Sequence, residues 1–252
     1  MRALLLAAAL LCAACSQPEA PRKPAAEAPK AVEYFHPDSA TAGAVSGTIR
    51  FSGARPARHV ISMDAEEGCQ KLHQGKPVYD EPVITGKNNG LANAFVYIQT
   101  GLEDKKFEPP KEAVAIDQIG CMFVPRVVGI QAAEPLTLKN SDPVSHNIHP
   151  MPVNNREWNE QQSPGTPEVQ HKFARTEVMI PVKCNVHGWM HAWIGVVAHP
   201  YFTVTGPDGS FEWKNVPPGT YTVAVWHEKL GEQKQEMHLA ASGTAEVHFT
   251  YR

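Results

Sequence analysis

The chain has 252 residues, of which 42% are hydrophobic and 19% charged, a composition typical of globular domains and unlike that of a wholly disordered chain. Its 23 Lys and Arg against 26 Asp and Glu give a formal net charge of −3 without a dense basic run, which argues against nucleic-acid binding. The 22 Pro and 18 Gly, set between short β-branched runs, favour an all-β fold of sheets and turns.

Residues 1–15 have the layout of an export signal, with one Arg, an apolar run and small residues before Cys15. The apolar run is too short to span a bilayer as a mature helix. The sequence from Cys12 to Cys15 resembles the lipobox of bacterial lipoproteins, although Cys12 stands where Leu is usual. The resemblance implies a signal peptide, lipidation of Cys15 and a protein anchored to a membrane in the periplasm. Plain cleavage, giving a soluble secreted protein, is the alternative.

Residues 16–43 contain four prolines among Ala, Glu and Lys, namely Pro18, Pro21, Pro24 and Pro29. Such a mixture cannot bury enough apolar area to offset the entropy of ordering. We predict a disordered tether that separates a folded module from the membrane.

Three cysteines follow the tether: Cys69, Cys121 and Cys184. An odd number of thiols in an oxidising compartment leaves one that needs burial or a metal. Cys184 lies among candidate metal ligands, whereas Cys69 and Cys121 have only His73 near them. We therefore predict a disulfide between Cys69 and Cys121, with two buried reduced thiols as the alternative.

The segment from Cys184 to His191 offers a thiolate, two imidazoles and a thioether, from Cys184, His187, Met190 and His191. Copper is served by two His, one Cys and a weak axial Met, whereas structural zinc favours four strong ligands. His146, which follows an apolar alternation and a polar turn, supplies the second imidazole.

The segments NSDPVSHNI and CNVHGWMHAW, in this order, resemble a cupredoxin, the blue-copper electron-transfer fold. The resemblance implies a Greek-key β-sandwich with one mononuclear copper, held equatorially by His146, Cys184 and His187 and axially by Met190. Because the spacing from His187 to Met190 is shorter than in plastocyanin-type loops, His191 stays open as the axial ligand. His149 is a weaker candidate, and His171 and His199 are expected to be structural.

The segment TVTGPDGSFEWKNVPPGTYTVAV resembles carboxypeptidase regulatory-like domains, which are transthyretin-like β-sandwiches. Residues 199–252 supply too few strands for such a domain, and residues 45–53 and 91–98 read as its first strands. We predict a discontinuous sandwich of residues 44–101 and 199–252, with the cupredoxin-like domain, residues 102–198, inserted. The alternative is a cupredoxin of residues 44–198 followed by a short domain. Trp226 and His227 form either an exposed recognition pair or, more commonly for such a Trp, part of the core.

A copper site held by strand ends and one loop changes geometry little between oxidation states, which suits transfer of single electrons. We expect an electron carrier and not an enzyme, because the sequence shows no second, catalytic copper centre. Its expected partners are redox proteins of the periplasm or membrane, met through residues 187–193 around an exposed His. The alternative is a lipoprotein that binds or delivers copper without redox function, or that uses the cupredoxin as an interaction scaffold. A copper enzyme with a solvent-open site ranks last.

Overall fold

The computed structural model describes residues 32–252. The predicted export signal, its lipidation site Cys15 and residues 16–31 of the predicted tether lie outside the described residues. Elements follow in the order β1 (Gly43–Phe51), β2 (His59–Val60), α1 (Glu67–His73), β3 (Tyr79–Asp80), the 3-10 helix η1 (Lys87–Asn89), β4 (Phe95–Thr100), β5 (Val114–Gln118), β6 (Phe123–Val124), β7 (Val127–Gln131), β8 (Leu136–Asn140), β9 (His146–Pro150), β10 (Glu160–Gln162), β11 (Val169–His171), β12 (Glu177–Lys183), β13 (His191–Val197), β14 (Phe202–Val204), β15 (Ser210–Val216), β16 (Gly219–His227), β17 (Gly231–Leu239) and β18 (Thr244–Tyr251). The all-β prediction is confirmed. No helix of the described part is long and apolar enough to cross a membrane.

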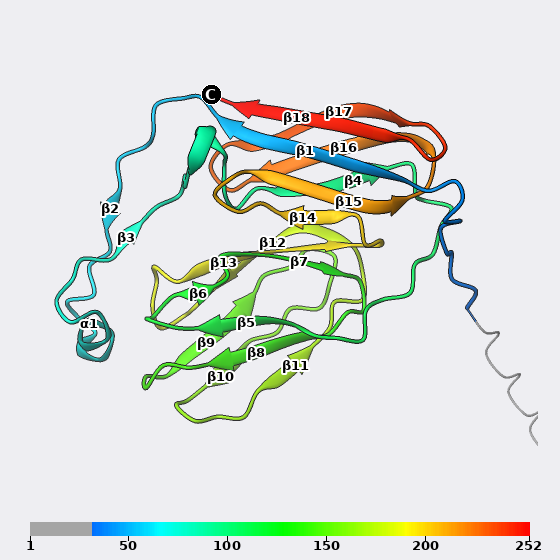
Figure 1. Cartoon of the computed structure of the whole chain (residues 1–252). Helices are drawn as coiled ribbons and strands as arrows, with labels where there is room; N and C mark the ends of the chain where they lie inside the picture. The colour runs from blue at the N-terminus through cyan, green and yellow to red at the C-terminus, as the bar shows by residue number, and fades with distance from the viewer. Residues whose placement is uncertain (1–31) are drawn as a thin grey trace, which may run out of the picture. The chain divides into compact units, whose positions relative to one another are not determined.

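Strand β1 lies between two strands from the far end of the chain. Val45, Ile49 and Phe51 are buried and alternate with more exposed residues, since successive side chains of a strand point to opposite faces. The strand pairs in parallel with β18 and antiparallel with β15, so that Thr48 lies opposite His248 and Ser210. Figure 1 shows blue β1 beside red β18 and orange β15.

The second sheet of this sandwich has the order β14-β4-β16-β17, and β4 pairs with both β14 and β16. Side chains from the two sheets form one apolar core, which includes Ile49, Val96, Val223 and Phe249. Strands before residue 101 and after residue 201 thus share one sandwich. These pairings support the proposed discontinuous sandwich of residues 44–101 and 199–252.

Residues 114–197 form two further sheets, with the orders β10-β9-β12-β13-β7 and β11-β8-β5-β6. Their inward-facing residues make a separate core that contains Cys184 and Met190. A third apolar cluster joins this half to the outer face of β4 through residues such as Phe95, Val127 and Met179. A Cβ atom at Gly195 would lie 2.7 Å from the Phe95 ring, so this close approach requires a glycine.

One predicted boundary differs from the structure, and one open alternative is decided by it. The ordered chain begins before residue 44, because the Phe35 N–H donates to the Lys106 carbonyl at 2.6 Å and the Phe35 ring packs edge-on against Phe107. Of the two alternatives for Trp226 and His227, the structure favours the core and not an exposed recognition pair, because His227 is only 1% exposed and Trp226 packs partly buried against the third cluster and Trp193.

Residues 53–90, which we call the cover segment, connect β1 to β4 and contain β2, α1 and β3. In Figure 1 this cyan segment leaves the first sandwich and runs down beside the second half. It is bound there by the Cys69–Cys121 disulfide and by an ion pair between Asp80 and Arg126 at 3.0 Å. The cover segment therefore connects two strands of the first sandwich and packs Val83 into its core, while the disulfide and the Asp80 ion pair attach it to the second half.

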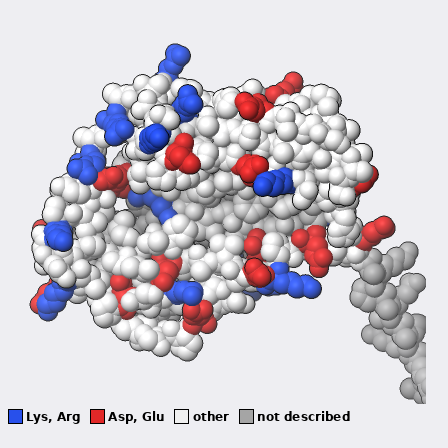
Figure 2. Space-filling view, in the orientation of Figure 1, with Lys and Arg blue, Asp and Glu red and all other residues white. Residues whose placement is uncertain are grey.

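Charged side chains of both signs are interspersed over the face drawn in Figure 2. Neither the basic nor the acidic side chains form one continuous patch on that face. The arrangement matches the formal net charge of −3.

Candidate metal centre

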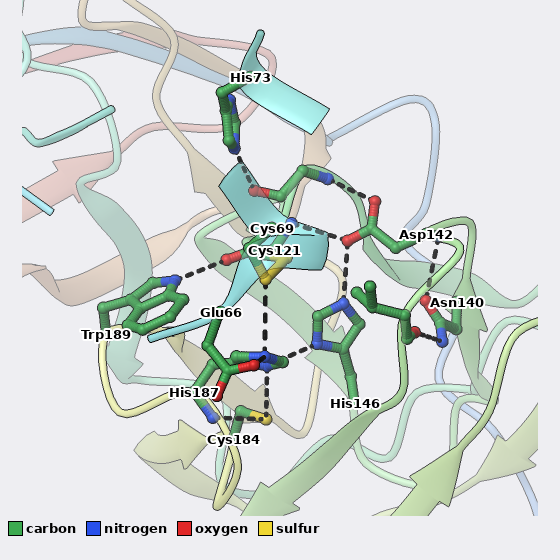
Figure 3. Close-up of a disulfide and its surroundings, with 12 residues drawn as sticks. Glu66, Cys69, His73, Cys121, Asn140, Asp142, His146, Cys184, His187 and Trp189 are labelled. Carbon is green, nitrogen blue, oxygen red and sulfur yellow. Dashed lines mark hydrogen bonds and ion pairs between the residues drawn. A yellow bond between two sulfur atoms is a disulfide. The ribbon is translucent and has the colours of Figure 1, made fainter. Parts of the chain in front are cut away.

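Three of the predicted ligands meet in one buried cluster. His146 opens β9, Cys184 directly follows β12, and His187 lies in the loop before β13. Their ligand atoms all lie within 4.8 Å of one another, and the three residues are 0%, 3% and 2% exposed. The two imidazoles face each other with Nδ1 atoms 2.9 Å apart, and Nδ1 of His187 lies 3.8 Å from Cys184 Sγ (Figure 3).

The loop between β12 and β13 is held in shape by its own backbone. The Cys184 N–H donates to the Met190 carbonyl at 3.1 Å, and the Met190 N–H donates to the His187 carbonyl at 2.9 Å. The His187 N–H points at Cys184 Sγ, 3.4 Å away. These contacts keep both ligands on the inner side of the loop, and Met190 is fully buried in the same core as Cys184.

Asp142 positions the first imidazole. One carboxylate oxygen lies 2.9 Å from Nε2 of His146 and accepts the Cys121 N–H, while the other accepts the Gly120 N–H, both at 2.7 Å. Burial opposes ionisation of Asp142, but the hydrogen bonds outweigh it and hold its pKa below the ordinary value. With Nε2 occupied in this way, Nδ1 of His146 faces the cluster.

Electrostatics prepare the other two ligands for a cation. Burial raises the pKa of Cys184, but the hydrogen bond from His146 and nearby backbone N–H groups outweigh it, so the pKa is lowered. Burial and then the charge of His146 lower the pKa of His187, which keeps that imidazole neutral. Because metal ions bind the thiolate and the neutral imidazole, these two shifts favour binding. The pKa of His146 shifts the other way: burial lowers it, but the hydrogen bonds with Asp142 and Cys184 outweigh burial and raise it, so a metal ion would displace a proton there.

The remaining candidate ligands make contacts elsewhere. Nδ1 of His191 lies 2.9 Å from the Trp189 carbonyl oxygen, and its Nε2 contacts the Arg126 guanidinium. His149 lies 3.1 Å from the Asn185 side-chain oxygen and 2.6 Å from a Glu157 oxygen. The structure therefore brings neither His149 nor His191 to the cluster.

His171 and His199 also lie outside the cluster. His171 stacks on Trp158 with ring centroids 4.0 Å apart. Nε2 of His199 lies 2.8 Å from the Ile98 carbonyl oxygen. Both contacts belong to the framework of the fold.

The outer edge of the cluster is closed by the cover segment. Cys69 and Cys121 form a disulfide whose Cα atoms are 5.8 Å apart. Nε2 of His187 lies 3.6 Å from Cys69 Sγ and 3.7 Å from a Glu66 carboxylate oxygen (Figure 3). His187 is therefore not the exposed His expected within residues 187–193, because the disulfide and Glu66 lie in front of it and leave it 2% exposed.

Comparison with known proteins gives a limited likeness. No protein-family model matches the chain, and no curated protein matches it. Solved structures similar to part of the chain include a copper-containing nitrite reductase from Thermus scotoductus, at 19% identity over 40% of this chain and 25% of that one, with a TM-score of 0.32. A purple cupredoxin from Nitrosopumilus maritimus is 21% identical over 33% of this chain and 98% of its own, with a TM-score of 0.29. A variant of amicyanin in the Cu(I) form is 14% identical over 40% of this chain and 97% of its own, with a TM-score of 0.30. At these identities and TM-scores the similarity does not indicate the function of this chain.

Proposed function

We propose that this protein binds one copper ion and transfers single electrons with it. His146, Cys184, His187 and Met190 would hold the ion, and the bound ion would supply one-electron redox chemistry. The observation that carries the proposal is the buried cluster of one thiol and two imidazole nitrogens within 4.8 Å of one another.

The donor set favours copper over structural zinc. In the described part of the chain no fourth His, Cys, Asp or Glu ligand atom lies within that distance of all three. Structural zinc sites use four strong ligands, whereas two His and one Cys with a weak thioether suit copper. The fully buried Met190 is the thioether that the loop provides.

Burial of the ligands supports a carrier in place of an enzyme. A catalytic metal site keeps a position open to substrate, but here the three ligands are at most 3% exposed. The proposed partners are redox proteins of the periplasm or membrane, and the proposed location is the periplasm, through a lipid on Cys15.

One observation favours a second candidate function, copper binding for delivery. Electron carriers of this kind are expected to present an imidazole edge to their partners, and His187 is covered by Cys69 and Glu66. A delivery protein would hold Cu(I) tightly and form no stable Cu(II) state.

The visible and electron paramagnetic resonance spectra after addition of Cu(II) test the proposal. An intense thiolate-to-copper band that is retained in His191→Gln and lost in Cys184→Ser and His187→Gln supports the carrier. His191→Gln is the matched control for His187→Gln, because His191 lies in the same loop region but bonds outside the cluster. Tight Cu(I) binding without a stable Cu(II) form would transfer the assignment to delivery, and absence of copper binding would refute both.

A further inference from the structure

The Cys69–Cys121 disulfide stands directly against the candidate metal centre. Its sulfur atoms, together with Nε2 of His187, form a second group of potential ligand atoms within 4.8 Å of one another. Cys69 and Cys121 are 1% and 0% exposed. The His187 ring thus borders two groups, with Nδ1 toward Cys184 and Nε2 toward Cys69 (Figure 3).

We propose that these two cysteines form a second, redox-convertible site for a soft cation such as Cu(I). Oxidised, the pair is a disulfide that covers His187. Reduced, it presents two thiols, which bind Cu(I) as thiolates, the ligand type that selects this ion, and Nε2 of His187 is a neighbouring third donor when Nδ1 holds no ion. This site uses neither Cys184 nor Met190 but shares His187 with the first copper site. Because a neutral imidazole offers one lone pair, the two sulfur atoms alone would hold the second ion while Nδ1 of His187 binds the first.

The conversion balances with a dithiol, either a small molecule or a protein, as the reductant. The sulfur–sulfur bond between Cys69 and Cys121 breaks as the reductant forms its own disulfide, and the two thiol protons of the reductant pass to the cysteines. Cu(I) then displaces these two protons as two bonds from sulfur to copper form.

The way in which α1 is attached explains how a reductant reaches a buried disulfide. Cys69 is the only buried residue of this seven-residue helix. Besides the disulfide, α1 is held by the contact between Nε2 of His73 and the Gly120 carbonyl oxygen, 2.8 Å apart, and by Leu72, which packs partly buried against the second core. Elements with few buried apolar contacts open locally at low free-energy cost, which exposes the sulfur atoms to attack.

The surroundings of the disulfide keep the reduced pair together. The Cys121 N–H is held by Asp142, and the Cys121 carbonyl accepts the Trp189 indole N–H at 3.0 Å. The cover segment stays connected to β1 and β4 at its two ends, and Asp80 remains paired with Arg126. Cys69 therefore stays near Cys121 after the covalent bond is broken.

Counting bound Cu(I) under anaerobic conditions, by competition with a coloured Cu(I) chelator, tests the proposal on the full chain. Chain treated with dithiothreitol and freed of it should bind one more equivalent of Cu(I) than the oxidised chain. Cys184→Ser removes the first site and should keep this difference of one equivalent, whereas the double variant Cys69→Ser, Cys121→Ser should lose it. Failure of the first copper site therefore gives a different pattern from failure of the second.

A second measurement does not depend on whether the double variant folds. In the reduced wild-type chain, iodoacetamide should modify Cys69 and Cys121, and Cu(I) should protect both from modification, as peptide mass spectrometry would show. Equal Cu(I) uptake by the oxidised and reduced chains, or modification that Cu(I) does not slow, would overturn the proposal. Resistance of the native disulfide to dithiothreitol would overturn it as well, since such a pair is not convertible.

Discussion

Replacing Asp142 by Asn tests whether this carboxylate positions the candidate metal ligand His146. The Asp142 side chain is 4% exposed and receives hydrogen bonds from the Gly120 and Cys121 N–H groups and from His146. An Asn side chain keeps its shape but offers one acceptor oxygen in place of two. Whichever way the amide turns, at least one N–H group, half-buried at Gly120 or buried at Cys121, loses its acceptor.

The cost follows from these contacts. A buried donor left without a partner costs about 1–3 kcal/mol, and hydrogen bonds to a charged acceptor are worth more than those to a neutral one. If the amide oxygen keeps Cys121 and His146, Gly120 loses its acceptor and the other two bonds lose their charge assistance. The sum is a loss of about 2–4 kcal/mol in the free energy of unfolding of the metal-free chain. Loss of an outer partner of a ligating His lowers metal affinity by about 10–100-fold.

Urea unfolding of the metal-free chain and competition for Cu(I) with a chelator would measure the two effects. Asp117→Asn is the matched control, because Asp117 also accepts backbone N–H groups, from Gln118 and Ser141, but does not contact the cluster. It is partly exposed, so water replaces the lost bonds. Equal loss of stability and equal metal affinity in the two variants would refute the positioning role of Asp142.

Three further predictions concern the framework. Burial lowers the pKa of His227 from 6.5 to about 4, so below pH 6.5 the unfolded chain gains a proton that the folded chain does not. His227 should therefore contribute a fall of about 3 kcal/mol in the free energy of unfolding between pH 6.5 and 4, and urea unfolding across that range should show a fall smaller by about this amount in His227→Gln. Arg126→Met leaves the Glu228 carboxylate, 4% exposed, without its cation and should cost about 3–5 kcal/mol in urea unfolding, most of which the added change Glu228→Gln restores. In Gly47→Ala the new Cβ would lie 1.8 Å from a β18 carbonyl oxygen, so the midpoint of thermal unfolding should fall strongly. The control Gly188→Ala, whose Cβ would have no atom within 4 Å, should unfold at the wild-type midpoint. Equal midpoints of the two variants would contradict the pairing of β1 with β18.

The candidate ligands that the structure brings together are either close in the sequence or placed at the end of a strand. Cys184 and His187 lie in one tight loop, so their spacing alone places both on the same side. His146 follows a strand with clear apolar alternation and begins the next one. Asp142 lies four residues before His146 in a polar turn, and this spacing alone only weakly indicates a contact between them. The fold brings the two side chains together.

The cover segment could not be predicted because its contacts are not local. Residues 53–90 show no apolar period that indicates which surface they pack on, and only Cys69 of α1 is buried. The sequence predicted a disulfide between Cys69 and Cys121 without indicating that it would lie against His187. Burial of that imidazole therefore comes from a segment outside the residues that carry the ligands.

Through the cover segment, the first sandwich affects the burial of the candidate metal centre. The cover segment begins at the end of β1 and returns to β4, so pairing of these strands with β15, β18, β14 and β16 fixes both of its ends. Burial is the largest cause that lowers the pKa of His187. Removal of the cover segment would therefore raise this pKa, and a proton would compete more strongly with a metal ion for the imidazole. Breaking the disulfide alone would loosen α1 but leave the segment held at both ends and at Asp80. The sandwich would thus contribute to the proposed metal binding through the cover segment, which connects the two halves.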